Sequence, residues 1–123
     1  MPTTKTYTEG VHTGEHVLSE ANGDRSRELG TLASGNHVAG TVLALNADGD
    51  YVQLAPTATD GTETAVAVLY DNVDASEAPQ PCVVHARDCT VHGAMLTWPA
   101  AATAPQIATG TEELAALHII IRD

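Results

Sequence analysis

The chain has 123 residues, the length of one domain, and carries 5 lysine and arginine residues against 16 aspartate and glutamate residues. The resulting net charge of −11 argues against binding to nucleic acids or to anionic membrane surfaces. Alanine contributes 20 of the apolar residues and phenylalanine is absent, so large core-forming side chains are scarce, and we expect part of the burial to come from association with other chains.

Signals for membranes and secretion are missing from the sequence. No run approaches the 18 apolar residues of a transmembrane helix, and MPTTKTYTEG at the start has no apolar stretch typical of a secretory signal. We therefore expect a protein made in the cytoplasm. Cys82 and Cys89 are then expected to be free thiols, with a bridge across a hairpin as the alternative.

Residues 1–28 differ in composition from the rest of the chain. They are polar and rich in threonine, and apart from Met1 their large apolar side chains are Tyr7, Val11, Val17 and Leu18. This is too little apolar surface for the segment to fold alone. It is either a disordered tail or an extended arm that orders on a partner, and we favour the arm. Residues 29–123 are expected to form one β-rich domain.

Three apolar runs open the expected domain. Residues 40–45 and 51–55 are typical of β-strands, and Asp48-Gly49 between them supplies the positive φ of a tight turn, so the two runs predict a hairpin. Residues 65–70, AVAVLY, are apolar without alternation, which predicts a strand buried on both faces.

The second half continues with further strand patterns. Residues 71–81 are acidic and contain proline, which predicts a surface loop. Residues 82–87 and 89–92 predict strands that are joined or bent near Asp88. A last pattern, residues 95–98, ends at Pro99, which cannot donate to a sheet.

The C-terminal part combines one helix and one strand. The alanine- and threonine-rich residues 99–110 are expected to be a loop. Thr109 and Glu112 have the spacing of a capping box, which predicts a short helix over residues 112–117. Residues 119–122 predict a closing strand. The expected fold is therefore mostly β, a single barrel-like domain with one short helix and an extended N-terminal arm.

Potential chemistry is sparse. The densest group of potential metal ligands is His85, Asp88, Cys89 and His92. Strict strand alternation places His92 on the opposite face, but a bend at Asp88 could bring it back, so a zinc site stays an alternative. His12 and His16 flank a glycine that disfavours a helix, and we expect both to be solvated. No nucleophile elbow, phosphate loop or carboxylate pair is recognisable. The sequence therefore carries no recognisable catalytic signal.

Several segments together resemble the lambdoid-type head decoration proteins of tailed phages. The resemblance covers about residues 26–123 and depends on the order and spacing of motifs that are individually weak. In chain order they are Ser26-Arg27, TLASG at 31–35, AGTVL at 39–43, YVQL at 51–54, Asp60-Gly61, AVAVL at 65–69, the segment 83–99 ending in Leu-x-Trp-Pro, and the segment 114–122.

The resemblance implies a small tulip-like β-domain that forms a homotrimer at local three-fold positions on the outside of the expanded head. It implies no enzymatic activity and no cofactor, the major capsid protein as partner, and an N-terminal arm that adds a strand to that protein. We expect Tyr7, Val11, Val17 and Leu18 to be the anchors, because they are the large apolar side chains of the arm apart from Met1. Trp98, followed by Pro99, is expected to be a core aromatic or a subunit-interface anchor. The alternatives are a phage tail or baseplate adaptor, or a small β-barrel metalloenzyme that uses the His85 group.

Overall fold

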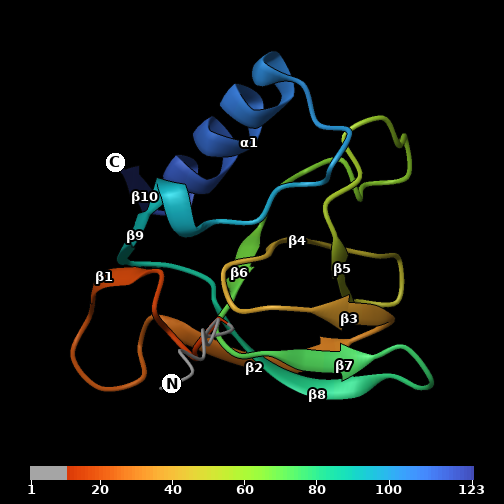
Figure 1. Cartoon of the computed structure of the whole chain (residues 1–123), viewed down its shortest axis with the longest axis horizontal. Helices are drawn as coiled ribbons and strands as arrows, with labels where there is room; N and C mark the ends of the chain where they lie inside the picture. The colour runs from red at the N-terminus through yellow and green to blue at the C-terminus, as the bar shows by residue number, and fades with distance from the viewer. Residues whose placement is uncertain (1–10) are drawn as a thin grey trace, which may run out of the picture.

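The computed structural model describes residues 11–123, and their fold is mostly β with one α-helix, as predicted (Figure 1). Tyr7 lies outside the described residues. The elements are, in order, β1 (Val17–Glu20), β2 (Arg27–Leu32), β3 (Gly35–His37), β4 (Val42–Leu45), β5 (Tyr51–Gln53), β6 (Ala67–Leu69), β7 (Val73–Ala75), β8 (Gln80–His85), β9 (Cys89–His92), the 3-10 turn η1 (Gly93–Met95), α1 (Ala104–Ala116) and β10 (Ile119–Arg122).

Five of these strands close into a barrel in the order β2-β5-β4-β6-β8. The longest pairing is antiparallel, between β2 and β8, and runs from Arg27 opposite His85 to Leu32 opposite Gln80. The predicted hairpin is confirmed, because β4 and β5 pair antiparallel and Gly49 in their connection has a φ of 83°.

Two apolar cores lie on opposite sides of the shared strands β4 and β6. Successive residues of a strand point to opposite faces, so Leu43 packs in one core while Val42 and Ala44 pack in the other. The same alternation divides β6, in which all three residues are buried. The prediction of a strand buried on both faces is therefore confirmed, and its continuous apolar character follows from having a core on each side.

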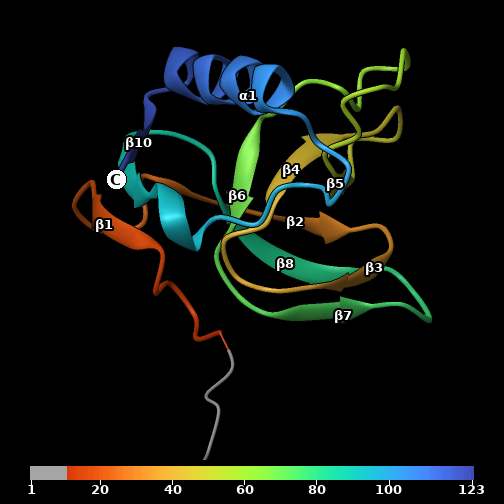
Figure 2. The ribbon, with the colours of Figure 1, turned by 45° about the horizontal axis from the view of Figure 1, so that its top comes forward.

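The core that contains Val42 and Ala44 is covered by α1 and by a three-stranded sheet in the order β1-β9-β10. Leu114 of the helix and Ile119 of β10 are both fully buried in this core. Strand β10 runs parallel to β9, whereas β1 pairs antiparallel with β9 on the other side. Figures 1 and 2 show the helix covering one end of the molecule, with β10 beside the helix and β1 farther from it.

The helix begins earlier than predicted. It starts at Ala104, and its capping box joins Thr103 to Gln106, whereas the expected box at Thr109 lies inside the helix. Pro105 occupies the first turn, where its missing N–H has no helical partner to lose. The loop expected over residues 99–110 is therefore largely helical.

Two other expectations differ from the structure. Residues 71–81 contain strand β7, which pairs antiparallel with β3, instead of being loop throughout. Residues 95–98 do not form a strand: η1 ends at Met95, and Thr97 makes only an isolated bridge to Thr41. The predicted bend near Asp88 is confirmed, since Asp88 has a φ of 52° between β8 and β9.

The boundary expected at residue 28 falls inside strand β2. Ser26 is fully buried, and its hydroxyl accepts from the Ala21 amide at 2.9 Å and donates to the Asp88 carbonyl at 2.8 Å. Strand β1, also within residues 1–28, is part of the three-stranded sheet. The described residues before Leu29 have few large apolar side chains of their own, and they are held in place by contacts with the rest of the chain.

Candidate functional site

Strand β1 carries two of the expected anchors and lies at an edge of its sheet. Val17 pairs with Val91 of β9 and is half-buried, whereas a bulge follows it and leaves Leu18 52% exposed. Within the described residues, β9 is the only strand that pairs with β1. Among the described residues the other edge of β1 is therefore unpaired, and an unpaired strand edge is a feature to which a further strand can be added.

The segment that leads into β1 is fixed to the domain by three hydrogen bonds. All three involve the chain just after β6: the Asn72 Nδ2 donates to the Val11 carbonyl at 2.7 Å, the Thr13 hydroxyl donates to the Asp71 carboxylate at 2.6 Å, and the Gly14 amide donates to the Tyr70 carbonyl at 2.9 Å. Val11 is half-buried there. These bonds therefore fix the position of Val11, the first described residue, on the surface of the domain.

A charged network at the end of β1 ties three strands together. The Arg27 guanidinium donates twice to the Glu20 carboxylate, at 2.7 and 3.1 Å, and the His85 Nε2 lies 2.6 Å from the same carboxylate. These hydrogen bonds, Arg27 first and His85 second, lower the pKa of Glu20. Arg27 also lies over the Tyr70 ring at 4.3 Å, which is a cation–π distance.

The expectation of a solvated His16 is wrong. Its side chain is fully buried between β1 and the barrel, with its ring centroid 6.1 Å from that of His85 in an edge-on arrangement. Burial, and next the neighbouring His85, lower the pKa of His16 to about 4. Sequence reasoning missed this residue because a histidine in a polar, glycine-spaced segment carries no local signal of burial.

The metal-ligand alternative finds no site in the described part of the chain. The His85 Nε2 is hydrogen-bonded to the Glu20 carboxylate. Cys89 is buried in the apolar core, where burial raises the pKa of its thiol to about 11. His92 is half-buried on β9. Among residues 11–123, no three histidine, cysteine or acidic side chains come close enough together to hold a metal ion.

Comparison with known families decides between the remaining interpretations. The family described as bacteriophage lambda head decoration protein D matches residues 6–119, which is most of the chain. This chain belongs to that family. No curated protein matches it significantly. Membership identifies a structural protein of the phage head, with a location at the virion capsid, and confirms the resemblance to head decoration proteins.

Trp98 and Pro99 lie apart from β1, on the helix side of this head decoration protein. Trp98 is half-buried and packs against the core that α1 covers. A Cβ added to Gly110 would meet the Trp98 ring at 2.6 Å, so the indole covers the helix at this glycine. The tryptophan therefore joins the segment after η1 to α1, and Pro99 follows as a half-buried residue.

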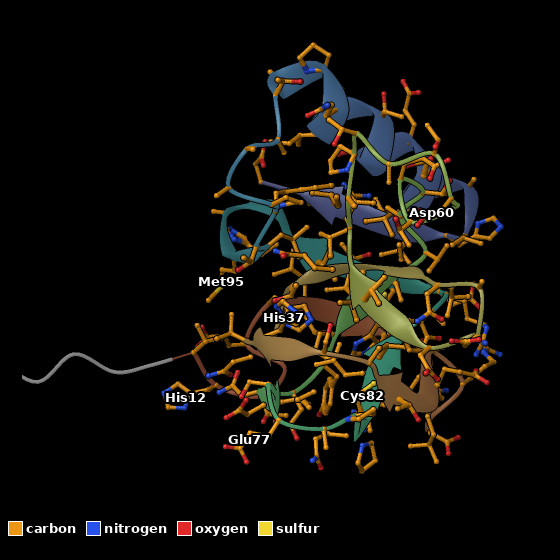
Figure 3. All side chains as sticks on the ribbon, turned by 90° about the vertical axis from the view of Figure 1, so that its right-hand side faces the viewer. His12, His37, Asp60, Glu77, Cys82 and Met95 are labelled. Carbon is orange, nitrogen blue, oxygen red and sulfur yellow. The ribbon has the colours of Figure 1, made fainter. Side chains whose placement is uncertain are left out.

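The acidic side chains of the decoration protein are dispersed. Figure 3 shows Asp60 near the helix end and Glu77 at the opposite end of the molecule. A hollow of about 260 Å³ beside α1 includes Glu63 and Glu113, but the Glu63 carboxylate accepts from the Gly61 amide and that of Glu113 from the Ala65 amide. The Glu63 carboxylate thus stabilises its own turn, and that of Glu113 joins α1 to the segment before β6.

The described chain also contains no helix that is both long and apolar enough to cross a bilayer.

Proposed function

We propose that this protein cements the expanded phage head from outside, as a homotrimer at the local three-fold positions of the capsid lattice, and so resists the pressure of packed DNA. The observation that carries the proposal is the match to the head decoration family over residues 6–119. The partners are two further copies of the chain and the major capsid protein. In this role the protein needs neither a cofactor nor an enzymatic activity.

The proposed contact with the capsid begins at the N-terminal arm. Leu18 supports this assignment, because it is exposed on an edge strand whose outer main-chain groups can accept another strand. Val17 contributes through main-chain pairing, since its side chain already packs on its own domain. Tyr7 and Val11 extend the contact along the arm, and the fixed position of Val11 sets where the arm leaves the domain.

The proposed contact between copies is supported by an exposed leucine on the barrel wall. Leu29 lies in the middle of β2 opposite Val83 of β8, and its side chain is 82% exposed. Leu29 and Val83 line a hollow of about 210 Å³, whose other lining residues are the charged Asp24, Arg27 and Glu28. Burying this surface in a trimer would supplement the alanine-rich core. Trp98 and Pro99 are proposed to stabilise the individual subunit.

Multivalency explains how modest contacts resist a large force. Once one subunit of a trimer is bound, the other two arms search a small volume, so the whole trimer binds far more tightly than one arm. Outward movement of the lattice must then break contacts on several capsid subunits at the same time.

The decisive experiment mixes the purified protein with undecorated expanded heads. The full chain is compared with a chain that lacks residues 2–10, because a deletion that also covered the anchors up to Leu18 would remove the packed His16 and part of strand β1. We expect the truncated chain to keep its melting temperature and to lose most of its binding to heads. Equally tight decoration by the truncated chain would show that the arm is not the clamp.

A matched pair of substitutions locates the contact more closely. Leu18→Ser should weaken decoration, whereas Leu45→Ser, at a leucine that is 39% exposed on β4, should not. Light scattering of the free protein tests the trimer separately, and a stable monomer at micromolar concentration would contradict that part of the proposal.

A further inference from the structure

His16 is a fully buried titratable side chain that has no hydrogen-bond partner on either ring nitrogen among the described residues. Buried polar atoms in folded proteins are nearly always paired. The sequence places this exception directly before β1, the strand that connects the N-terminal segment to the domain. When β1 is attached, the surroundings of His16 therefore favour the neutral form of its imidazole over the protonated form.

Among the described residues, no carboxylate is hydrogen-bonded to the His16 ring. The centroid of the His85 ring lies 6.1 Å from that of His16, and the Glu20 carboxylate is already engaged by His85 and Arg27. Gly40, which adds no charge, lies on another side, since a Cβ built there would be 3.7 Å from the His16 Cβ. The ionisable groups contributed by the surrounding elements are Glu20 from β1, Arg27 from β2, Tyr70 after β6, His85 from β8, and Cys89 and His92 from β9.

The geometry allows β1 to detach while the barrel stays closed. Within the described residues β1 pairs with β9 alone, over only three aligned pairs and with a bulge among them. The five barrel strands do not include β1 or β9. Detachment would also break the hydrogen bond from the His92 amide to the His16 carbonyl, which is 2.7 Å long. It would also separate the Glu20 carboxylate from Arg27 and His85, and it would expose His16 to water.

We propose that His16 makes β1 an acid-released latch: mild acid detaches His16 and strand β1 from β9 while the barrel remains folded. The proposal concerns the free chain and holds whether or not the arm binds capsids. On a decorated head it would make the position from which the arm starts sensitive to acid.

The direction of the effect follows from linkage. In the detached strand His16 titrates near its ordinary pKa of 6.5, and in the attached strand its pKa is lowered to about 4. The free energy by which neutral His16 favours the attached strand is therefore fully present above pH 6.5, and it is lost as the pH falls towards 4. Proton uptake raises the ratio of detached to attached strand about 30-fold between about pH 7.5 and pH 5. Glu20, whose pKa is also lowered, adds a loss in the same direction only below its ordinary pKa of 4.5.

Amide hydrogen exchange, corrected for the intrinsic rate at each pH, tests the latch in the full-length protein. We expect protection of the β1 amides to fall about 30-fold from about pH 7.5 to pH 5, while amides in β8 keep theirs. His16→Leu and His16→Phe should both remove the pH dependence. His118→Asn is the matched control, because it removes an exposed histidine at a φ of 64°, which asparagine accepts, and it should behave like the wild type.

Three results would overturn the proposal. These are equal protection of β1 at both pH values, an unchanged pH dependence in the His16 variants, and a parallel loss of protection in β1 and β8, which would indicate global unfolding. If neither His16 variant folds, NMR titration of the wild-type histidine rings decides instead. A ring of His16 that titrates near its ordinary pKa while β1 stays protected would equally refute the latch.

Discussion

Gly110 offers a test of how Trp98 packs, because two effects of opposite sign meet at this position. It is a buried glycine inside α1, where alanine would be the better helix former. However, a Cβ at this position would lie 2.6 Å and 3.0 Å from two atoms of the Trp98 ring. Gly110→Ala therefore gains helix propensity and forces the indole to move away from the core.

The magnitudes favour destabilisation. Replacing glycine by alanine in a helix interior gains about 1 kcal/mol. Overpacking at a well-filled contact costs about 1–3 kcal/mol. We expect a net loss of about 1 kcal/mol for Gly110→Ala, which in a domain of this size lowers the melting temperature by about 3–5 °C.

A double-mutant cycle measured by urea denaturation isolates the contact. Trp98→Leu removes the ring atoms that face Gly110 and should itself cost about 2 kcal/mol as a large-to-small change. In that background Gly110→Ala should become stabilising by about 1 kcal/mol, which gives a coupling energy of about 2 kcal/mol. If Gly110→Ala stabilises the wild type, or has the same effect in both backgrounds, Trp98 does not cover the helix as described.

Two further predictions concern buried groups. Ser26→Ala should lower the free energy of unfolding in urea by about 1–3 kcal/mol, because the Ala21 amide and the Asp88 carbonyl both lose their partner; a change below about 0.3 kcal/mol would refute this role. Cys82 and Cys89 should resist alkylation in the folded protein at about pH 8 and react on unfolding, because burial raises the pKa of both thiols; rapid labelling of the native chain would contradict their burial.

The sequence by itself determined the elements that depend on residues close together in the chain, such as the β4–β5 hairpin. Asp48-Gly49 specifies a tight turn through the positive φ of glycine, and the runs beside it pair as predicted. The apolar residues 65–70 predicted two-sided burial because a strand with a core on each face needs no polar side. The order and spacing of such elements also carried the resemblance to head decoration proteins, which the family match confirms.

The helix shows where local signals become ambiguous. Thr103 with Gln106 and Thr109 with Glu112 have the same capping spacing, so sequence alone cannot rank them. Tertiary packing chooses the earlier start, because it adds more than a turn of helix and places Gly110 under the Trp98 ring.

Only the tertiary structure decided how residues 11–28 are placed. By composition they cannot bury enough apolar surface to offset their ordering entropy. Strand β9, the turn at Asp88 and the segment after β6 supply the missing partners, and they draw β1, Ser26 and His16 into the domain. Burial of a polar residue depends on what lies across from it in space, and for His16 those neighbours come from distant parts of the sequence, where no local pattern records them.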